Sequence, residues 1–173
     1  MARMSPSSTA DRHAPPWTDD SLSHLVVHRH AAAGANRTAW AVRAARAWLG
    51  PEQDDAPAGM RRHHADLRLR VSDTPSVTTF RKAAFVDFGI IQPTNDGWEV
   101  EVGWRASTLA PLFPVFSGWI VARADELTLS GWYAPPGGQL GQVADRVLFH
   151  IAATGTARWL LAEIDRAAAR SAS

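Results

Sequence analysis

Hydrophobic and polar residues alternate through much of the chain from residue 23 to residue 133. In the first such stretch, residues 23–30, Leu25 and Val27 share one face, which predicts a strand with one buried side. The other face of this stretch carries three histidines: His24, His28 and His30. The same period of two predicts further strands at residues 65–71, 77–88, 98–105, 113–122 and 127–133.

Two stretches have a helical period instead. Residues 35–49 are rich in alanine, place Trp40, Ala44 and Trp48 at helical spacing, and end at a Gly-Pro pair that closes a helix. Residues 51–60 are a loop by composition. Residues 139–169 contain no proline and predict a helix roughly 45 Å long at 1.5 Å per residue. Its expected inner stripe is Val143, Val147, Ile151, Thr154, Leu161 and Ile164.

This order of elements predicts an α+β protein, because a run of strands is followed by one long helix. A curved antiparallel sheet wrapped around that C-terminal helix buries the apolar faces of both. Residues 21–170 would form a single domain. Residues 1–20, rich in Ser, Pro and Ala, predict a flexible tail, and whether its Trp17 docks on the domain stays open.

The turns set the register of the predicted strands. A two-residue tip at Ala124 and Asp125 pairs Phe116 with Tyr133, Gly118 with Gly131, and Ile120 with Leu129. The turn at residues 93–97 pairs Phe88 with Val102 and Val86 with Trp104. The expected interior surface is Ala84, Val86, Phe88, Trp98, Val100, Val102, Trp104, Ile120, Leu127 and Leu129. The residues expected to point to water are Arg81, Asp87, Glu99, Glu101 and Arg105.

The alternation of residues between the two faces of each strand leaves three features with two interpretations each. Lys82 falls on the inner face, either as a rim residue or as a polar contact for a ligand. The facing glycines, Gly118 and Gly131, either relieve crowding at a sheet bend or leave volume for a ligand. Trp119 and Trp132 share the outer face, either as a shielded local contact or as the interface of a homodimer.

Composition narrows the function classes. The chain has 173 residues, a formal net charge of +1 and no cysteine. Without cysteine there are no disulfides, thiol nucleophiles or Cys-based metal sites. The near-zero charge argues against a nucleic-acid module and favours a neutral, apolar ligand over a phosphate. No apolar run approaches the roughly 20 residues of a membrane span, and no signal peptide is evident, so a soluble cytoplasmic protein is expected.

Several short motifs lie in the C-terminal half of the chain. They are LFPVF at residues 112–116, LTLSG at 127–131 and YAPPG at 133–137, followed by Leu140-Gly141, Asp145-Arg146 and His150. With the closing helix, they resemble the bacterial branch of the START-like, helix-grip superfamily, which includes polyketide cyclase/dehydrase-like and lipid-transfer proteins. The resemblance implies a cavity between sheet and C-terminal helix that takes an apolar or amphipathic small molecule. The family usually has two short helices after its first strand, whereas this sequence predicts one helix and a loop.

The predicted ligand-binding residues line that cavity. They are Phe88, Trp104, Phe116, Gly118, Gly131, Tyr133, Val147, His150, Ile151 and Thr154. Three functions stay open: a carrier or sensor, a cyclase- or dehydratase-like enzyme, and an interaction protein whose cavity is filled by its own side chains. In an enzyme, His150 or Tyr133 would move the proton.

No metal or other cofactor is expected. The histidine face of residues 23–30 should be solvated and has no carboxylate at ligand spacing, and the adjacent His63 and His64 lie on opposite sides of any strand. The nucleophile-elbow, Walker and dinucleotide-binding motifs do not occur in the sequence.

Overall fold

The computed structural model describes residues 22–70, 79–107, 114–134 and 143–171, without the side chains of 67–70, 79–82 and 143–148. The predicted tail with Trp17 lies outside the described residues, as do Leu112-Phe113 and residues 135–142 of the motifs. The side chains of Arg81, Lys82 and Val147 are also outside them.

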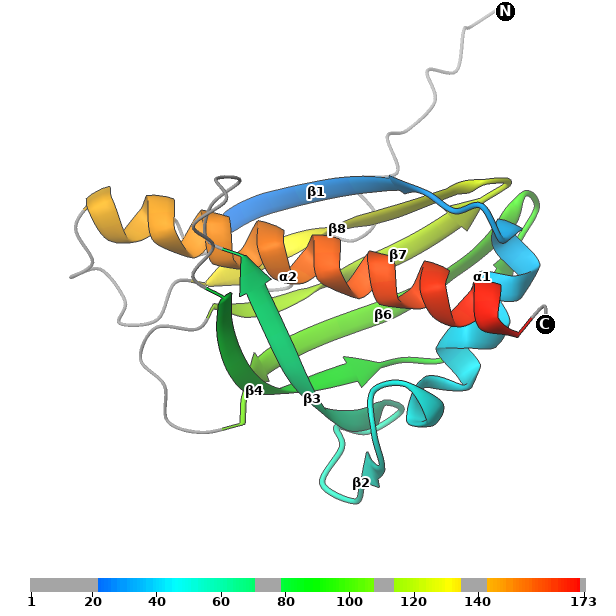
Figure 1. Cartoon of the computed structure of the whole chain (residues 1–173), viewed down its shortest axis with the longest axis horizontal. Coiled ribbons are helices and arrows are strands. Elements are labelled where there is room, and N and C mark those ends of the chain that lie inside the picture. The colour runs from blue at the N-terminus through cyan, green and yellow to red at the C-terminus, as the bar shows by residue number, and fades with distance from the viewer. Residues whose placement is uncertain (1–21, 71–78, 108–113, 135–142, 172–173) are drawn as a thin grey trace, which may run out of the picture.

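The chain folds into one antiparallel sheet of eight strands and two α-helices (Figure 1). The strands are β1 Ser23–His30, β2 Glu52–Gln53, β3 Arg61–Arg70, β4 Thr79–Phe88, β5 Gln92–Thr94, β6 Gly97–Ala106, β7 Val115–Arg123 and β8 Glu126–Ala134. Their order in the sheet is β1-β8-β7-β6-β4-β3-β2, and β5 pairs with β6. The predicted α+β class with an antiparallel sheet and a C-terminal helix is confirmed.

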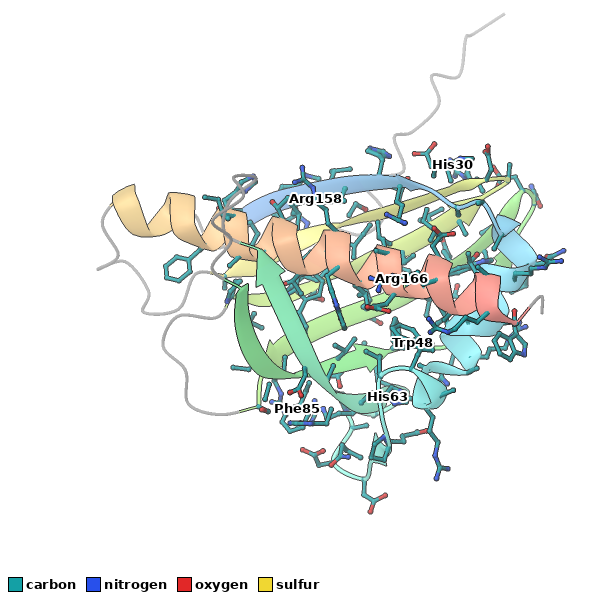
Figure 2. The ribbon with its side chains drawn as sticks, viewed as in Figure 1. His30, Trp48, His63, Phe85, Arg158 and Arg166 are labelled. Carbon is teal, nitrogen blue, oxygen red and sulfur yellow. The ribbon has the colours of Figure 1, made fainter. Side chains whose placement is uncertain are left out.

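The helices join and cover this sheet. α1, Gly34–Arg43, leads from β1 toward the opposite edge and is followed by a short 3-10 helix, Ala45–Ala47. The predicted helix at 35–49 is therefore divided, and Trp40 on it is exposed. α2, Val143–Arg170, crosses one face of the sheet (Figures 1 and 2). It contacts both β1 and β3, which lie near opposite ends of the strand order, so the sheet curls around it.

Both predicted registers are confirmed. In the β7–β8 hairpin, Gly118 pairs with Gly131 and Ile120 with Leu129. Ala124 at the tip has a φ of 47°, the left-handed conformation that a two-residue hairpin turn requires. On the other side of β6, Val86 pairs with Trp104. Every residue of the expected interior surface is buried: Ala84, Val86, Phe88, Trp98, Val100, Val102, Trp104, Ile120, Leu127 and Leu129.

The inner stripe of α2 differs from the predicted one. Leu161 and Ile164 are buried as expected, but Ile151 is 37% exposed and does not face the sheet. The buried stripe is Phe149, Ala153, Thr156, Ala157, Leu160, Leu161, Ile164, Ala167 and Ala168. The prediction followed the large apolar residues, whereas alanines occupy much of the face that approaches the sheet closely.

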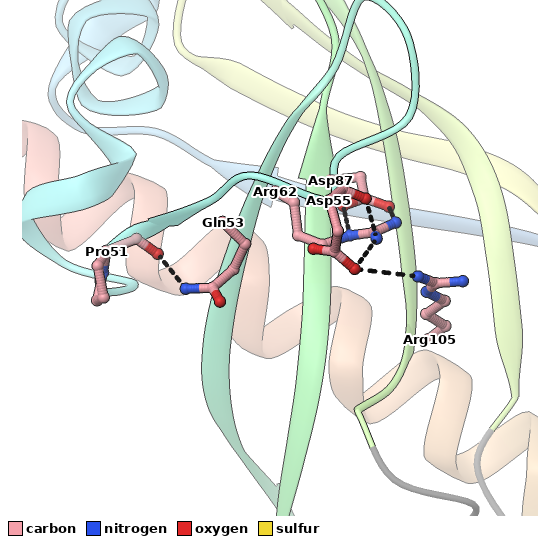
Figure 3. Close-up of polar contacts among 6 residues, drawn as sticks. All are labelled: Pro51, Gln53, Asp55, Arg62, Asp87 and Arg105. Atoms are coloured by element: carbon pink, nitrogen blue, oxygen red, sulfur yellow. Dashed lines mark hydrogen bonds and ion pairs between the residues drawn. The ribbon is translucent and has the colours of Figure 1, made fainter.

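Asp87 was expected to point to water, and this prediction is wrong. Asp87 is 7% exposed, and its carboxylate binds the Arg62 guanidinium through two hydrogen bonds of 2.8 Å (Figure 3). The backbone carbonyl and the carboxylate of Asp55 accept from the remaining nitrogen of Arg62, at 2.6 and 2.9 Å. The segment that carries Asp55, between β2 and β3, therefore covers the outer face at this point. Glu99 and Glu101 are half-buried, and Arg105 is exposed as expected.

Candidate functional site

A single row of side chains crosses the inner face of the sheet. Successive pairings join His63 on β3, Val86 on β4, Trp104 on β6, Phe116 on β7 and Tyr133 on β8. All five are buried. Since residues that are paired across neighbouring strands share a face, the strand registers alone place these aromatic and polar groups in one line.

Trp104 and Phe116 form the aromatic centre of this row. Their rings stack with centroids 3.9 Å apart and planes inclined by 8°. Trp104 is 1% exposed, and its Nε1 has no hydrogen-bond partner among the described residues. An unpaired buried N–H costs about 1–3 kcal/mol, so this donor is available to an acceptor that enters the interior.

His63 occupies the β3 end of the row (Figure 2). Its Nδ1 lies 3.1 Å from the carbonyl oxygen of Gly50, to which it donates when it carries the proton. Its Nε2 is buried and has no partner in the described part of the chain. Burial lowers the pKa of this ring below its ordinary 6.5, more than the hydrogen bond to Gly50 raises it. His63 therefore presents a neutral ring with one unpaired acceptor.

Acidification from about pH 7.5 to about pH 5.5 is expected to destabilise the protein partly through His63. Because its folded pKa is depressed, the unfolded chain binds this proton more readily, so the stability is complete above about pH 6.5 and falls as the pH drops below it. The slope reaches at most about 1.4 kcal/mol per pH unit for one group. Urea unfolding at both pH values should show a smaller loss for His63→Leu than for the wild type. The exposed neighbour His64→Leu should keep the wild-type loss, and an unchanged loss in His63→Leu would refute the assignment.

Tyr133 and His150 meet at the β8 end of the row. The Tyr133 hydroxyl lies 3.2 Å from His150 Nδ1, and Tyr133 as a whole residue is 3% exposed. His150 is exposed, so the pair connects the interior with the surface. One helical turn further along α2, the Thr154 hydroxyl is buried and has no partner among the residues described. The two residues singled out for proton transfer are therefore in direct contact.

The facing glycines lie where two strands approach closely. A Cβ atom built on Gly118 or on Gly131 would lie 2.7 Å from Phe116 Cζ in each case. The Gly118 Cβ would come closer still to the backbone carbonyl oxygen of Ser130 and would lie 2.7 Å from the Cα of Gly131, so the backbone of β8 also leaves no room for a side chain. The Phe116 ring thus occupies the volume beside the glycines, which supports the sheet-bend interpretation of the pair.

Not all of the other predicted ligand-binding residues lie in the interior. Phe88 is buried on β4 and contacts His63 and Trp48, with ring centroids 6.4 and 6.5 Å apart. Ile151 lies on the exposed side of α2, and the side chain of Val147 lies outside the described residues. Sequence reasoning missed His63 as a site residue. The sequence did contain a signal for His63. Adjacent residues of a strand point to opposite faces, so one of the two neighbouring histidines must face inward.

A groove of about 300 Å³ lies between the edge strand β1 and α2. Its lining residues are His24, Leu25, Val26, Val27, His28, His150, Thr154 and Arg158. The groove therefore begins at the His150 end of the inner row and follows α2. Sequence reasoning did not single out Arg158, because a lone arginine on a helix is ordinarily a solvated surface residue.

A second groove, of about 360 Å³, lies on the outer face of β1, β8 and β7. Trp119 and Trp132 line it, both half-buried, and the ring of Trp132 lies 4.7 Å from that of His24. This contact accords with the local-contact interpretation of Trp132, and the homodimer through Trp119 and Trp132 stays a prediction.

Within the described residues, no group of three potential ligands is arranged to hold a metal ion, and no helix is long and apolar enough to cross a membrane. No protein-family model and no curated protein matches the chain. The resemblance to the START-like superfamily therefore stays a prediction from the sequence motifs.

Proposed function

We propose that this protein binds an amphipathic small molecule between the sheet and α2, as a carrier or sensor of the START-like, helix-grip kind. The strand order and the helix across the curled sheet support that family assignment. The observation that carries the proposal is the buried, unpaired N–H of Trp104 at the centre of the aromatic row. Binding sites for small molecules combine mainly apolar walls with a few polar groups of this kind.

Two kinds of interaction would hold the ligand. Its apolar part would gain roughly 25 cal/mol for each Å² removed from water against the Trp104–Phe116 stack. A carbonyl or hydroxyl oxygen would accept from Trp104 Nε1, and a donor would satisfy His63 Nε2. The Tyr133–His150 pair would orient the end of the ligand nearest the surface.

The first experiment is to purify the protein gently, extract it into organic solvent and analyse the extract by mass spectrometry beside a denatured control protein. A single compound at near-stoichiometric yield is the expected result. Trp104→Phe, which keeps an aromatic ring but removes the N–H donor together with part of the indole, should retain about tenfold less of that compound. Trp40→Phe, at an exposed position on α1, is the matched control and should retain as much as the wild type.

An empty extract, or equal retention by Trp104→Phe and the wild type, would contradict the carrier proposal. It would favour the interpretation in which the interior is filled by the protein's own side chains, as Phe116 fills the space beside the glycines.

The Tyr133–His150 contact favours one second candidate, a cyclase- or dehydratase-like enzyme. The imidazole would take a proton from a carbon next to a carbonyl of the substrate, while the Tyr133 hydroxyl donates to the carbonyl oxygen. The same imidazole would then protonate the departing hydroxyl, so that water leaves and a double bond forms. His150→Ala would abolish such turnover, whereas in a carrier it would only weaken binding.

A further inference from the structure

The groove between β1 and α2 has a chemistry distinct from that of the interior. Three polar residues of α2 line it at intervals of four: His150, Thr154 and Arg158. At a rise of 1.5 Å per residue they follow one another at about 6 Å along the same side of the helix. The first of them contacts Tyr133 of the inner row, so the groove continues the proposed cavity toward the solvent.

Arg158 has no acidic partner among the described residues. Two other arginines at or near this helix are paired: Arg29 of β1 with Asp165 of α2 at 3.0 Å, and Arg166 with Glu163, both on α2, at 2.9 Å. Figure 2 shows Arg158 and Arg166 on the same helix. None of the described residues that line the groove is acidic. Arg158 is exposed, so its positive charge is left available where the groove meets the proposed cavity.

The two other polar groups of α2 can act as donors beside Arg158. The Thr154 hydroxyl is buried and has no partner in the described part of the chain. When Tyr133 donates its hydroxyl proton to His150 Nδ1, the proton of the neutral imidazole lies on Nε2, the other ring nitrogen. A guanidinium, a hydroxyl and an imidazole N–H on one side of α2 match an acceptor that carries negative charge.

We infer that the ligand is an amphipathic carboxylic acid, bound with its carboxylate in this groove against Arg158, Thr154 and His150 and its apolar part under α2. The inference rests on the proposed function and specifies the ligand class. It replaces the neutral ligand that the balanced composition of the chain favours. One guanidinium supplies one full positive charge, which suits a monoanionic carboxylate better than a phosphate.

The test compares two ligands of the same size, decanoate and decanamide, by isothermal titration calorimetry near neutral pH. The wild type is expected to bind decanoate about tenfold more tightly than decanamide, since hydrogen bonds between charged groups are stronger than those between a charged group and a neutral amide. Arg158→Gln should abolish this preference and leave the affinity for decanamide within about twofold. Arg166→Gln, two turns further along α2, is the matched control and should keep the preference.

The outcomes separate the two proposals. Equal affinity of the wild type for both compounds, or a preference that survives Arg158→Gln, would overturn the carboxylate inference and leave the cavity proposal standing. Absence of binding by either compound, in titrations repeated with eight- and twelve-carbon analogues, would overturn both.

Discussion

Replacing Arg62 by alanine is expected to destabilise the protein by about 3–5 kcal/mol. Arg62 is 2% exposed and donates a hydrogen bond of 2.8 Å to each carboxylate oxygen of Asp87. These bonds raise the pKa of Arg62 above its ordinary value, although burial acts in the opposite direction. In the variant, Asp87 would remain buried beside β3 without its counter-charge. Urea unfolding monitored by circular dichroism would measure the loss.

The matched control is Arg123→Ala. Arg123 forms an ion pair of similar length with Asp96, at 3.0 Å, but both side chains are more than half exposed. Exposed pairs contribute about 0–1 kcal/mol, so this variant should stay within that range. The double variant Arg62→Met/Asp87→Leu, which removes both charges, should recover much of the stability lost in Arg62→Ala. If Arg62→Ala were no worse than Arg123→Ala, the buried pair would not hold the outer face together as described.

The Arg62 cluster also shows what periodicity cannot predict. The alternation of β4 correctly places Val86 and Phe88 inward and Asp87 outward. Alternation gives the face of a residue but not what covers that face. Here the segment carrying Asp55 packs over the outer face, and the Phe85 ring lies 5.1 Å from the Arg62 guanidinium carbon. The strand β2, which begins this covering segment, consists of two residues, too few for a period to be seen.

Helix α2 shows a second limit of the same kind. Its length and its contact with the sheet follow from the sequence, and the C-terminal part of the predicted stripe is correct. Nearer its beginning, Ala153 and Ala157 face the sheet while Ile151 is exposed. Alanine is only weakly hydrophobic and therefore contributes little to a hydrophobic periodicity, yet its small side chain permits the closest approach of a helix to a sheet. A stripe predicted from the large apolar residues alone then lies on a different side of the helix from the face that packs on the sheet.

Most residues of the candidate site were predicted individually from the sequence, and the strand pairing of the structure shows how they lie together. Sequence reasoning identified Trp104, Phe116 and Tyr133 through the two turns, and His150 through the helix. It could not show that Tyr133 and His150 touch, because the rotation of α2 about its axis is not fixed by turn geometry. It also passed over Arg158, whose interest depends on the groove beside β1 and on the lack of an acidic partner among the described residues.

Gly118→Ala is the second variant with a large expected effect, a loss of about 3 kcal/mol in the free energy of unfolding. The added methyl group would come closest to the backbone carbonyl oxygen of Ser130 and would lie 2.7 Å from both the Gly131 Cα and Phe116 Cζ. The Phe116 ring can shift, but the backbone of β8 can move away only by weakening its pairing with β7. The expected cost is therefore at the upper end of the range for overpacking.

Gly103→Ala on β6 is the matched control for this variant. There the nearest atom to an added Cβ is the Phe116 carbonyl oxygen at 3.2 Å, so a shift of a few tenths of an ångström relieves the contact. Removing a glycine from a strand also gains roughly 0.5–1 kcal/mol, and Gly103→Ala should change the stability by less than about 1 kcal/mol.

Retention of the extracted compound should be measured in parallel with urea unfolding. If Gly118→Ala kept wild-type stability and lost the compound, the glycines would make room for the ligand rather than for the neighbouring strand. If it lost stability as expected, the ligand would have to lie beyond the Phe116 ring, toward Trp104 and Tyr133, where the unpaired indole N–H and the Tyr133–His150 pair are found.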